Sequence, residues 1–414
     1  MKVLKGFRLL LSGGVGPLAI VHVVSLGCGI AATVVWTRMM PQETFGQFKV
    51  VMAFLGVVSA FCLLGTSQAA LMSASKGADG NLVPLLRSKL LANVGGAIVI
   101  LGGATYYAWL RNDSGPVAIA LLAAAFFFPL YNTSDVWMAW LNGKSEFRAL
   151  ASGRIVTSLL TLVTVLSLGL IGDVDIWIIV LVLVAALSSQ NAFLLRKALK
   201  HRSGSIEDEK VMRLGRHATV AMLFSALLAL DVVILDHYYS PGDVAIYAVA
   251  LLFPDQIKAI FSIFIQTISP RMYRCESLKE LWAGFRSEFL VLTLGFALIA
   301  VLGFFLLPIL IPWLFSEKYV VAAEYGKWLW LTIGLLGSTS FLGIALTARH
   351  SLVTIYATGV GYPLCLGGLY FYWVEDGIEG MVTARIVATC GMAALFVSAF
   401  AILLWRERRG ASHA

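Results

Sequence analysis

Five charged side chains interrupt long apolar stretches of the sequence, where charge is rare. They are Asp135, Asp231, Asp255, Lys258 and Arg385. A charged group in the middle of a bilayer costs at least about 2.5–3.5 kcal/mol on insertion scales, so such groups usually face a cavity or a partner. The chemistry that they can supply is the binding of a charged ligand or the transfer of an ion.

Two of these residues, Asp255 and Lys258, are three positions apart, so on a helix they share a face and can pair. An anionic ligand, such as one that carries phosphate groups, needs concentrated positive charge for its binding. We therefore expect Lys258 and Arg385 to attract such an anion, with Asp255 beside them in a substrate cavity. The alternative is a neutralised ion pair that only packs two helices together.

The stretch YNTSDVWMAW (131–140) carries Asn132 and Asp135 on one helical face. This spacing predicts a polar cavity wall that can hydrogen-bond to a ligand. Trp137 and Trp140 can stack on sugar rings, or they can belong to the aromatic belt at the membrane interface.

Asp231 is expected near the outer end of a helix in apolar surroundings, where its carboxylate can carry an ion coupled to transport. The alternative is a helix-end residue that reaches the lipid headgroups. Gln68 and Gln266 are uncharged candidates for the same cavity, although such residues more often join helices by hydrogen bonds.

Apolar helices must position these side chains, because 59% of the residues are hydrophobic and only 13% are charged, against about 25% charged in soluble proteins. A run of about 20 apolar residues crosses a hydrocarbon core of roughly 30 Å. The sequence predicts an all-α polytopic membrane protein with about twelve such helices. The runs are 15–37, 48–72, 89–110, 116–141, 154–171, 175–195, 217–235, 244–268, 289–313, 322–347, 351–373 and 378–405.

The basic residues orient these helices. Of the 31 Lys and Arg residues, 24 lie in every second loop or at the termini, and this bias predicts cytoplasmic N- and C-termini. The net charge of +8 therefore indicates membrane orientation, and we expect no nucleic-acid partner because no loop is long enough to form a basic face.

The one sizeable hydrophilic stretch, near the middle of the chain, divides the predicted helices into two sets of six. We expect an N-terminal lobe at 1–200, a cytoplasmic linker at 201–216 and a C-terminal lobe at 217–414. Equal numbers of helices favour a duplication about an axis along the membrane normal. The turns PQETFGQFKVVMAF (41–54) and PGDVAIYAVALLF (241–253) can be aligned, but they can also be unrelated hairpin turns.

The five cysteines and six histidines have no spacing typical of a disulfide framework or a zinc site, so we expect no cofactor and no metal. The N-terminal MKVLKGFR is basic, but the apolar run after it is too long for a signal peptide and is expected to remain as the first helix.

Three segments carry a family resemblance. Residues 38–56 (RMMPQETFGQFKVVMAFLG), 231–253 (DVVILDHYYSPGDVAIYAVALLF) and 314–325 (LFSEKYVVAAEY) resemble segments of the polysaccharide flippases of the multidrug/oligosaccharidyl-lipid/polysaccharide exporter superfamily. In the third segment, Ser316 and Glu317 stand where that family usually has a Gly.

The resemblance implies two six-helix lobes around a central cavity that opens alternately to each side of the membrane. The implied cargo is a polyprenyl-pyrophosphate-linked oligosaccharide, such as a repeat unit of the O-antigen of lipopolysaccharide or of an exopolysaccharide. The implied setting is the bacterial inner membrane, with membrane lipids and a polysaccharide polymerase or export machinery as partners and with the chain acting as a monomer.

Two other functions remain open. A drug/cation antiporter of the same superfamily has the same fold and a different cargo. A membrane glycosyltransferase or polymerase usually needs a large exterior domain, whereas the predicted exterior loops have about 15 residues or fewer. We therefore expect a transporter rather than an enzyme.

Overall fold

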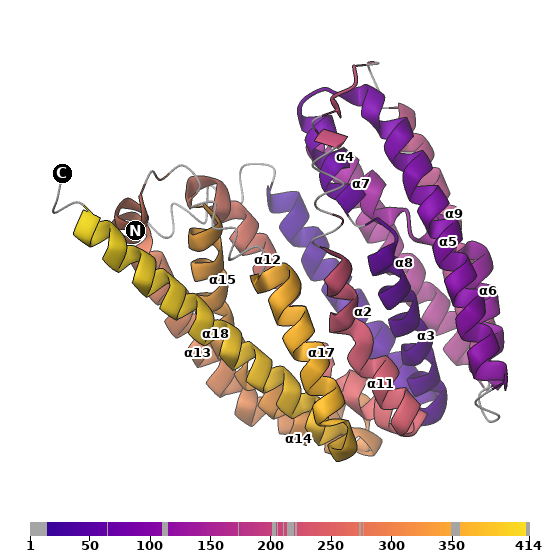
Figure 1. Cartoon of the computed structure of the whole chain (residues 1–414). Coiled ribbons are helices and arrows are strands. Elements are labelled where there is room, and N and C mark those ends of the chain that lie inside the picture. Colours follow the sequence, from indigo (N-terminus) through magenta and orange to yellow (C-terminus); the bar gives the residue numbers. More distant parts are fainter. Residues whose placement is uncertain are drawn as a thin grey trace. The chain divides into compact units, whose positions relative to one another are not determined.

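The computed structural model is helical, and it divides into two compact units, Met1–Leu230 and Asp231–Ala414. It describes residues 15–410 except 64, 110–114, 173, 201–203, 205, 210, 213–218, 220, 221, 273, 274, 276 and 349–356. No β-strand is formed by the residues so described. Figure 1 shows the helices of each unit.

Unit 1 contains the first helices of the described chain. Its elements are α2 (Val15–Met39), α3 (Gln42–Phe61), α4 (Gly65–Ser75), η1 (Asp79–Asn81), α5 (Leu82–Trp109), α6 (Gly115–Tyr131), α7 (Ser134–Gly143), α8 (Phe147–Ile171), α9 (Ile176–Lys200) and η2 (Leu223–Ala229).

Unit 2 contains the remaining helices, of which α11 begins one residue before the unit boundary. Its elements are α11 (Leu230–Tyr238), α12 (Pro241–Met272), α13 (Leu278–Phe315), η3 (Glu317–Tyr319), α14 (Val320–Leu331), α15 (Ile333–Ala348), η4 (Ala357–Gly361), α17 (Tyr362–Tyr372), η5 (Val374–Asp376) and α18 (Gly377–Gly410).

The predicted all-α membrane fold is confirmed. Eight segments of the described chain are long and apolar enough to cross a membrane, and Val23–Met39 adds a shorter apolar helix. Each of the twelve predicted runs coincides with at least one helix, although parts of 217–235 and 351–373 lie outside the described residues. About twelve crossings are therefore consistent with the structure.

Three predicted runs are broken into two helices, which the hydrophobic pattern did not indicate. The run 48–72 bends between α3 and α4, where Leu63 has a positive φ of 56°. The run 116–141 breaks between α6 and α7 just after Pro129, whose ring removes a backbone hydrogen bond. The run 322–347 divides into α14 and α15 at Thr332.

The predicted start of the third run at residue 89 was wrong, because α5 begins at Leu82. Leu82, Leu85 and Leu86 are buried at helical spacing, so the helix continues through the basic residues that were assigned to a loop.

The core of unit 1 at its basic end includes two tryptophans. Trp137 and Trp140 of α7 are buried with apolar residues of α4, α5, α8 and α9. The prediction that they stack on sugars or lie in the interfacial belt was therefore wrong; a ring with no more than 1% of its surface exposed reaches neither ligand nor headgroup.

A described part of the predicted central linker packs within unit 1 against the turn before α5. Asn81 accepts a hydrogen bond from the Asp208 N–H at 3.1 Å and donates to the Asp208 carbonyl at 3.0 Å. The Gly80 N–H donates to the Ile206 carbonyl at 2.8 Å, and Val211 is buried in the core. The linker segment around Asp208 is thus held by the turn before α5.

In unit 2, α13 packs against α14 and α15, and α18 packs against α15 and α17. The N-terminus of α13 is capped twice: Ser277 accepts from the Glu280 N–H at 3.1 Å, and Glu407 of α18 accepts from the Leu278 N–H at 3.0 Å. Carboxylates at a helix N-terminus are stabilising because they satisfy unpaired N–H groups. Glu407 therefore joins the end of α18 to the start of α13.

Candidate functional site

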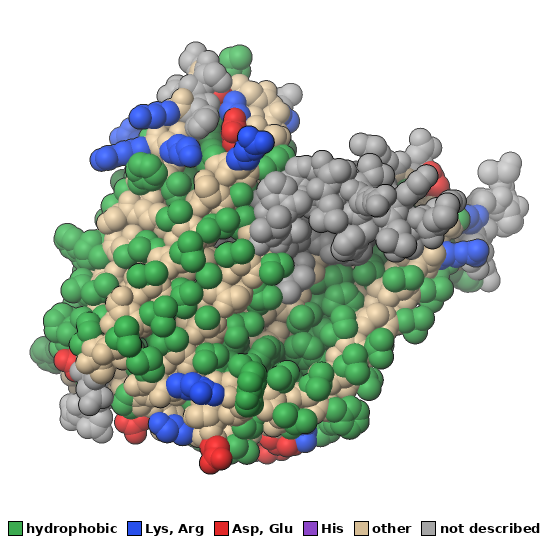
Figure 2. Space-filling view, turned by 180° about the vertical axis from the view of Figure 1, so that it is seen from behind, with side chains coloured by type: hydrophobic (Ala, Val, Ile, Leu, Met, Phe, Trp, Pro, Cys, Tyr) green, Lys and Arg blue, Asp and Glu red, His purple; other side chains and the backbone are tan. Residues whose placement is uncertain are grey.

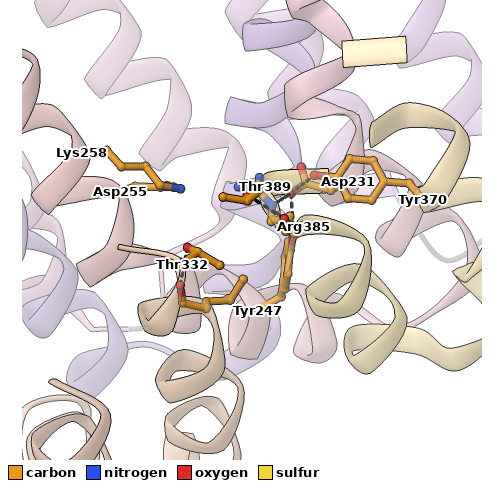
Figure 3. A network of polar contacts seen from close by, with 9 residues as sticks. Asp231, Tyr247, Asp255, Lys258, Thr332, Tyr370, Arg385 and Thr389 are labelled. Atoms are coloured by element: carbon orange, nitrogen blue, oxygen red, sulfur yellow. Dashed lines mark hydrogen bonds and ion pairs between the residues drawn. The ribbon is translucent and has the colours of Figure 1, made fainter. Parts of the chain in front are cut away.

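The first polar cluster lies in unit 2 and consists of Asp231, Tyr247, Tyr370 and Arg385, here called the Arg385 cluster (Figure 3). The Arg385 Nε donates to Asp231 Oδ2 at 3.0 Å and to Tyr247 Oη at 2.8 Å. The Tyr247 hydroxyl donates to Asp231 Oδ2 at 2.7 Å, and the Arg385 Nη2 forms an ion pair with the same oxygen. The Asp231 Oδ2 atom therefore accepts hydrogen bonds from a guanidinium and a hydroxyl group that lie on different helices.

Four helices position this cluster. Asp231 is the second residue of α11, Tyr247 lies on α12, Tyr370 on α17 and Arg385 on α18. The Val232 N–H donates to Asp231 Oδ1 at 2.9 Å, so the helix start holds the other carboxylate oxygen. The Arg385 guanidinium also lies 5.9 Å from the centre of the Tyr247 ring, within reach of a cation–π interaction.

The residues of the Arg385 cluster are buried and therefore depend on one another. The Asp231 side chain is 1% exposed and Arg385 is 18% exposed, while both tyrosines are fully buried. Removing one partner of a buried pair is strongly destabilising, because it leaves an unpaired charge in a medium of low dielectric constant. An anion that bound Arg385 would therefore have to replace Asp231 as its partner.

The second polar cluster lies in unit 1 and consists of Lys89, Asn93, Asn132 and Asp135, here called the Lys89 cluster. The Lys89 ammonium is fully buried and lies 3.0 Å from Asp135 Oδ2. The Asn132 amide donates to Asn93 Oδ1 at 2.9 Å, and the Asn93 amide donates to the Pro129 carbonyl at 2.9 Å. Asp135 Oδ1 is buried and forms no hydrogen bond with the described residues.

The break between α6 and α7 explains this arrangement. α6 ends at Tyr131, two residues after Pro129, and the last carbonyls of a helix lack backbone partners within it. Asn93 of α5 satisfies one, and Asn191 of α9 donates to the Tyr131 carbonyl at 2.8 Å. Asn191 Oδ1 in turn accepts from the Trp137 indole at 3.1 Å. Asn93 and Asn191 thus satisfy the carbonyls at the end of α6. Asp135 lies in the first turn of the next helix, α7.

Lys89 was missed by sequence reasoning, because it was counted with the loop cations. A usable signal was present: Lys89 and Asn93 are four residues apart, so they share a helical face once α5 is extended to Leu82. The two tyrosines of the Arg385 cluster were also missed, since nothing local to Tyr247 or Tyr370 distinguishes them from packing residues.

The other predicted site residues do not belong to either cluster. Asp255 and Lys258 pair at 3.3 Å on α12, and each is 41–51% exposed. In Figure 3 this pair lies beside the Arg385 cluster, and no hydrogen bond joins the two. Gln68 is exposed on α4, and the side chain of Gln266 lies outside the described residues. Substrate and ion-coupling roles for all these residues remain predictions.

Neither cluster has the composition of a metal or catalytic centre. In the described part of the chain, no three His, Cys, Asp or Glu residues lie close enough together to hold a metal ion. Each cluster instead pairs one cation with one carboxylate, a combination suited to binding an anion or exchanging a proton.

The model of one protein family, described as polysaccharide biosynthesis protein, matches residues 11–276. Comparison with curated proteins gives no significant match.

Solved structures resemble the whole chain. The lipid II flippase MurJ in an inward closed conformation has a TM-score of 0.66 at 13% identity, covering 92% of this chain and 86% of its own. An inward-facing multidrug resistance MATE transporter of the MOP superfamily has a TM-score of 0.63 at 14% identity, covering 93% and 98%. A MOP superfamily transporter from Pyrococcus furiosus has a TM-score of 0.63 at 14% identity, covering 94% and 96%. At these identities the likeness shows the fold.

Proposed function

The chain belongs to the polysaccharide biosynthesis protein family, and from this premise we propose that it is a flippase for polyprenyl-pyrophosphate-linked oligosaccharides. The observation that carries the proposal is the family match over residues 11–276, on a chain with the fold of MOP-superfamily transporters. A lipid-linked oligosaccharide is the form of a growing polysaccharide that must cross a membrane, and one of the similar structures is a lipid II flippase.

In the proposed mechanism, the cargo head enters by alternating access while its polyprenyl tail stays in lipid. Lys258 attracts the pyrophosphate first, because its ammonium is exposed and its partner Asp255 is equally solvated. The pyrophosphate then competes with Asp231 for the Arg385 guanidinium. Reforming the ion pair between Asp231 and Arg385 then expels the cargo on the other side.

The proposed setting is the bacterial inner membrane with both termini cytoplasmic and with the chain acting as a monomer. The product on the outer face is a substrate for a polysaccharide polymerase or export machinery, which is the proposed downstream partner. O-antigen and exopolysaccharide repeat units are both compatible cargoes.

The second candidate is a drug/cation antiporter, favoured by the likeness to MATE transporters. Such a cargo is cationic, so it would be drawn to the carboxylates rather than to Lys258 and Arg385. The family match favours the flippase over the antiporter. Glycosyl transfer has less support, because the similar structures named here are transporters and a flippase.

The test is translocation by the purified chain in proteoliposomes loaded with a fluorescent polyprenyl-pyrophosphate-linked oligosaccharide. The assay measures how fast the sugar head on the inner leaflet becomes accessible to a membrane-impermeant reagent. We expect a rate well above that of empty liposomes, with no effect from a cationic drug in excess. A background rate together with uptake of the cationic drug would instead establish the antiporter.

The role of Lys258 is tested separately with Lys258→Ala. Loss of one cation near a phosphate is worth roughly 1 kcal/mol, so the translocation rate should fall by about fivefold. The matched control is Lys327→Ala, because Lys327 pairs with Glu324, three positions before it on α14, as Lys258 pairs with Asp255 on α12. Equal rates for both variants would remove Lys258 from the cargo path while leaving the flippase assignment intact.

A further inference from the structure

A groove opens on the surface of unit 1 between α5 and α9. It has a volume of about 400 Å³, within the range of roughly 300–1,000 Å³ typical of small-molecule sites. Its walls are apolar except for one residue, Arg87. Neither polar cluster contributes a side chain to it.

One face of α5 forms the longer wall. Val83, Arg87, Leu91 and Val94 follow at steps of four, four and three residues, the spacing of a single helical stripe. Leu195 and Leu199 of α9, also four apart, form the facing wall. The α5 wall belongs to the segment Asp79–Trp109, which is long and apolar enough to cross the membrane, and its exposed apolar side chains are suited to contact with lipid.

The part of the groove beyond Arg87 fits within one leaflet. From Arg87 to Val94 the helix rises by about 10 Å at 1.5 Å per residue. This is less than half of a hydrocarbon core of roughly 30 Å, so the groove can hold the part of an acyl chain nearest the headgroup. Leu91 and Val94 are 65% and 49% exposed, so the deeper half of the groove is open to an acyl chain.

Positively charged residues lie at the end of the groove near Val83 and Leu199. Arg87 is exposed, and it forms no ion pair with the described side chains. The last two turns of α9 add Arg196, Lys197 and Lys200, and neither α5 nor α9 contains an acidic residue. Figure 2 shows basic side chains gathered at the end of this unit, above a broad hydrophobic surface. Basic pockets between membrane helices bind anionic lipid headgroups, and a guanidinium can bind a phosphate with two parallel hydrogen bonds.

We propose that this groove is a binding site for one anionic phospholipid of the leaflet at the basic end. Arg87 holds the phosphate, and an acyl chain lies along Leu91, Val94 and Leu195. A polyprenyl carrier fits less well, because its chain is far longer than one leaflet and the groove ends at Val94. The site is independent of the cargo, so it can exist whether or not the chain is a flippase.

The test uses the full chain in nanodiscs and two photoactivatable probes with identical acyl chains, a phosphatidylglycerol and a phosphatidylcholine. We expect the anionic probe to crosslink to α5 or α9 in preference to the zwitterionic one. Arg87→Gln should lower this preference by about fivefold, the value for one basic residue near a lipid phosphate. Leu91→Trp, which fills the open half of the groove, should lower crosslinking of both probes there.

The matched control is Arg148→Gln, because Arg148 is also exposed at a helix end of unit 1 but lies outside the groove. Its crosslinking should equal that of the wild type. Equal labelling by the two probes, or an unchanged preference in Arg87→Gln, would overturn the proposal. A polyprenyl phosphate that displaces the anionic probe better than unlabelled phosphatidylglycerol would also overturn it, since the groove would then hold carrier lipid.

Discussion

At the scale of single residues, Arg385 and Asp231 share one buried ion pair, so neither can act without the other. The sequence places them 154 positions apart, on helices whose packing no local pattern reveals. Anion binding by Arg385 and ion coupling by Asp231 were predicted separately, but the ion pair means that any such role of one residue involves the other.

The first prediction concerns the stability of this pair. Arg385→Ala should lower the free energy of unfolding by about 3–5 kcal/mol, because it leaves Asp231 buried and charged. The double variant Asp231→Asn/Arg385→Gln should recover part of that loss, since no unpaired charge remains. Thermal unfolding in detergent measures both. The single variants Asp231→Asn and Arg385→Gln complete a double-mutant cycle, in which additive losses would show that the two residues are not coupled.

The second prediction concerns the Lys89–Asp135 pair, whose partners differ in burial. Asp135→Ala leaves a fully buried ammonium, whereas Lys89→Met leaves an Asp135 side chain that is 26% exposed, although its Oδ1 atom is buried. Asp135→Ala should therefore be the more destabilising by at least about 1 kcal/mol, because desolvated charge costs more than partly solvated charge. The midpoints of thermal unfolding in one detergent compare them directly. The reverse order would indicate that Lys89 is solvated in the protein.

At the scale of elements, small residues set how closely helices approach. Gly303 of α13 lies against the indole of Trp330 on α14, and that indole is fixed by a 2.8 Å hydrogen bond to the Ile299 carbonyl. Without a hydrophobic force between helices in lipid, such close packing is a main source of their association. The α13–α14 contact therefore depends on the absence of a side chain at one position.

The third prediction follows from this contact. In Gly303→Ala, the new methyl group would overlap the Trp330 ring, so the variant should be about 1–3 kcal/mol less stable. Gly295→Ala on the same helix is the control, because nothing lies within 4 Å of its Cβ position. A methyl group there should be neutral or stabilise by up to about 1 kcal/mol. Similar unfolding midpoints for the two variants would contradict the packing described for α13.

At the scale of the whole molecule, the distribution of basic residues predicts the orientation in the membrane. The same end of unit 1 carries the basic rim of the α5–α9 groove and the docked linker segment around Asp208. If the positive-inside bias holds, that end is cytoplasmic, and the proposed phospholipid belongs to the inner leaflet.

The fourth prediction tests this orientation by cysteine labelling in a variant without the native cysteines. Cysteine at Glu207, an exposed linker residue, should react with an impermeant maleimide only after the cells are permeabilised. Cysteine at Asp175, in the short turn between α8 and α9, should react in intact cells. Labelling of position 207 from outside would invert the topology and with it the proposed direction of transport.

The sequence by itself determined that the chain lies in a membrane, that it is helical and roughly where each membrane run lies. These properties depend on the hydrophobicity and charge of short segments, which can be read without knowing their neighbours. The breaks at Leu63 and Thr332, the early start of α5 and the burial of Trp137 needed the tertiary structure, since each depends on what a neighbouring helix supplies. The pairing of Arg385 with Asp231 and of Lys89 with Asp135 was likewise decided only by packing. A charged residue in an apolar run indicates that a partner of opposite charge is needed. Only the folded structure shows which residue is that partner, because ion pairs can form between residues that are distant in sequence.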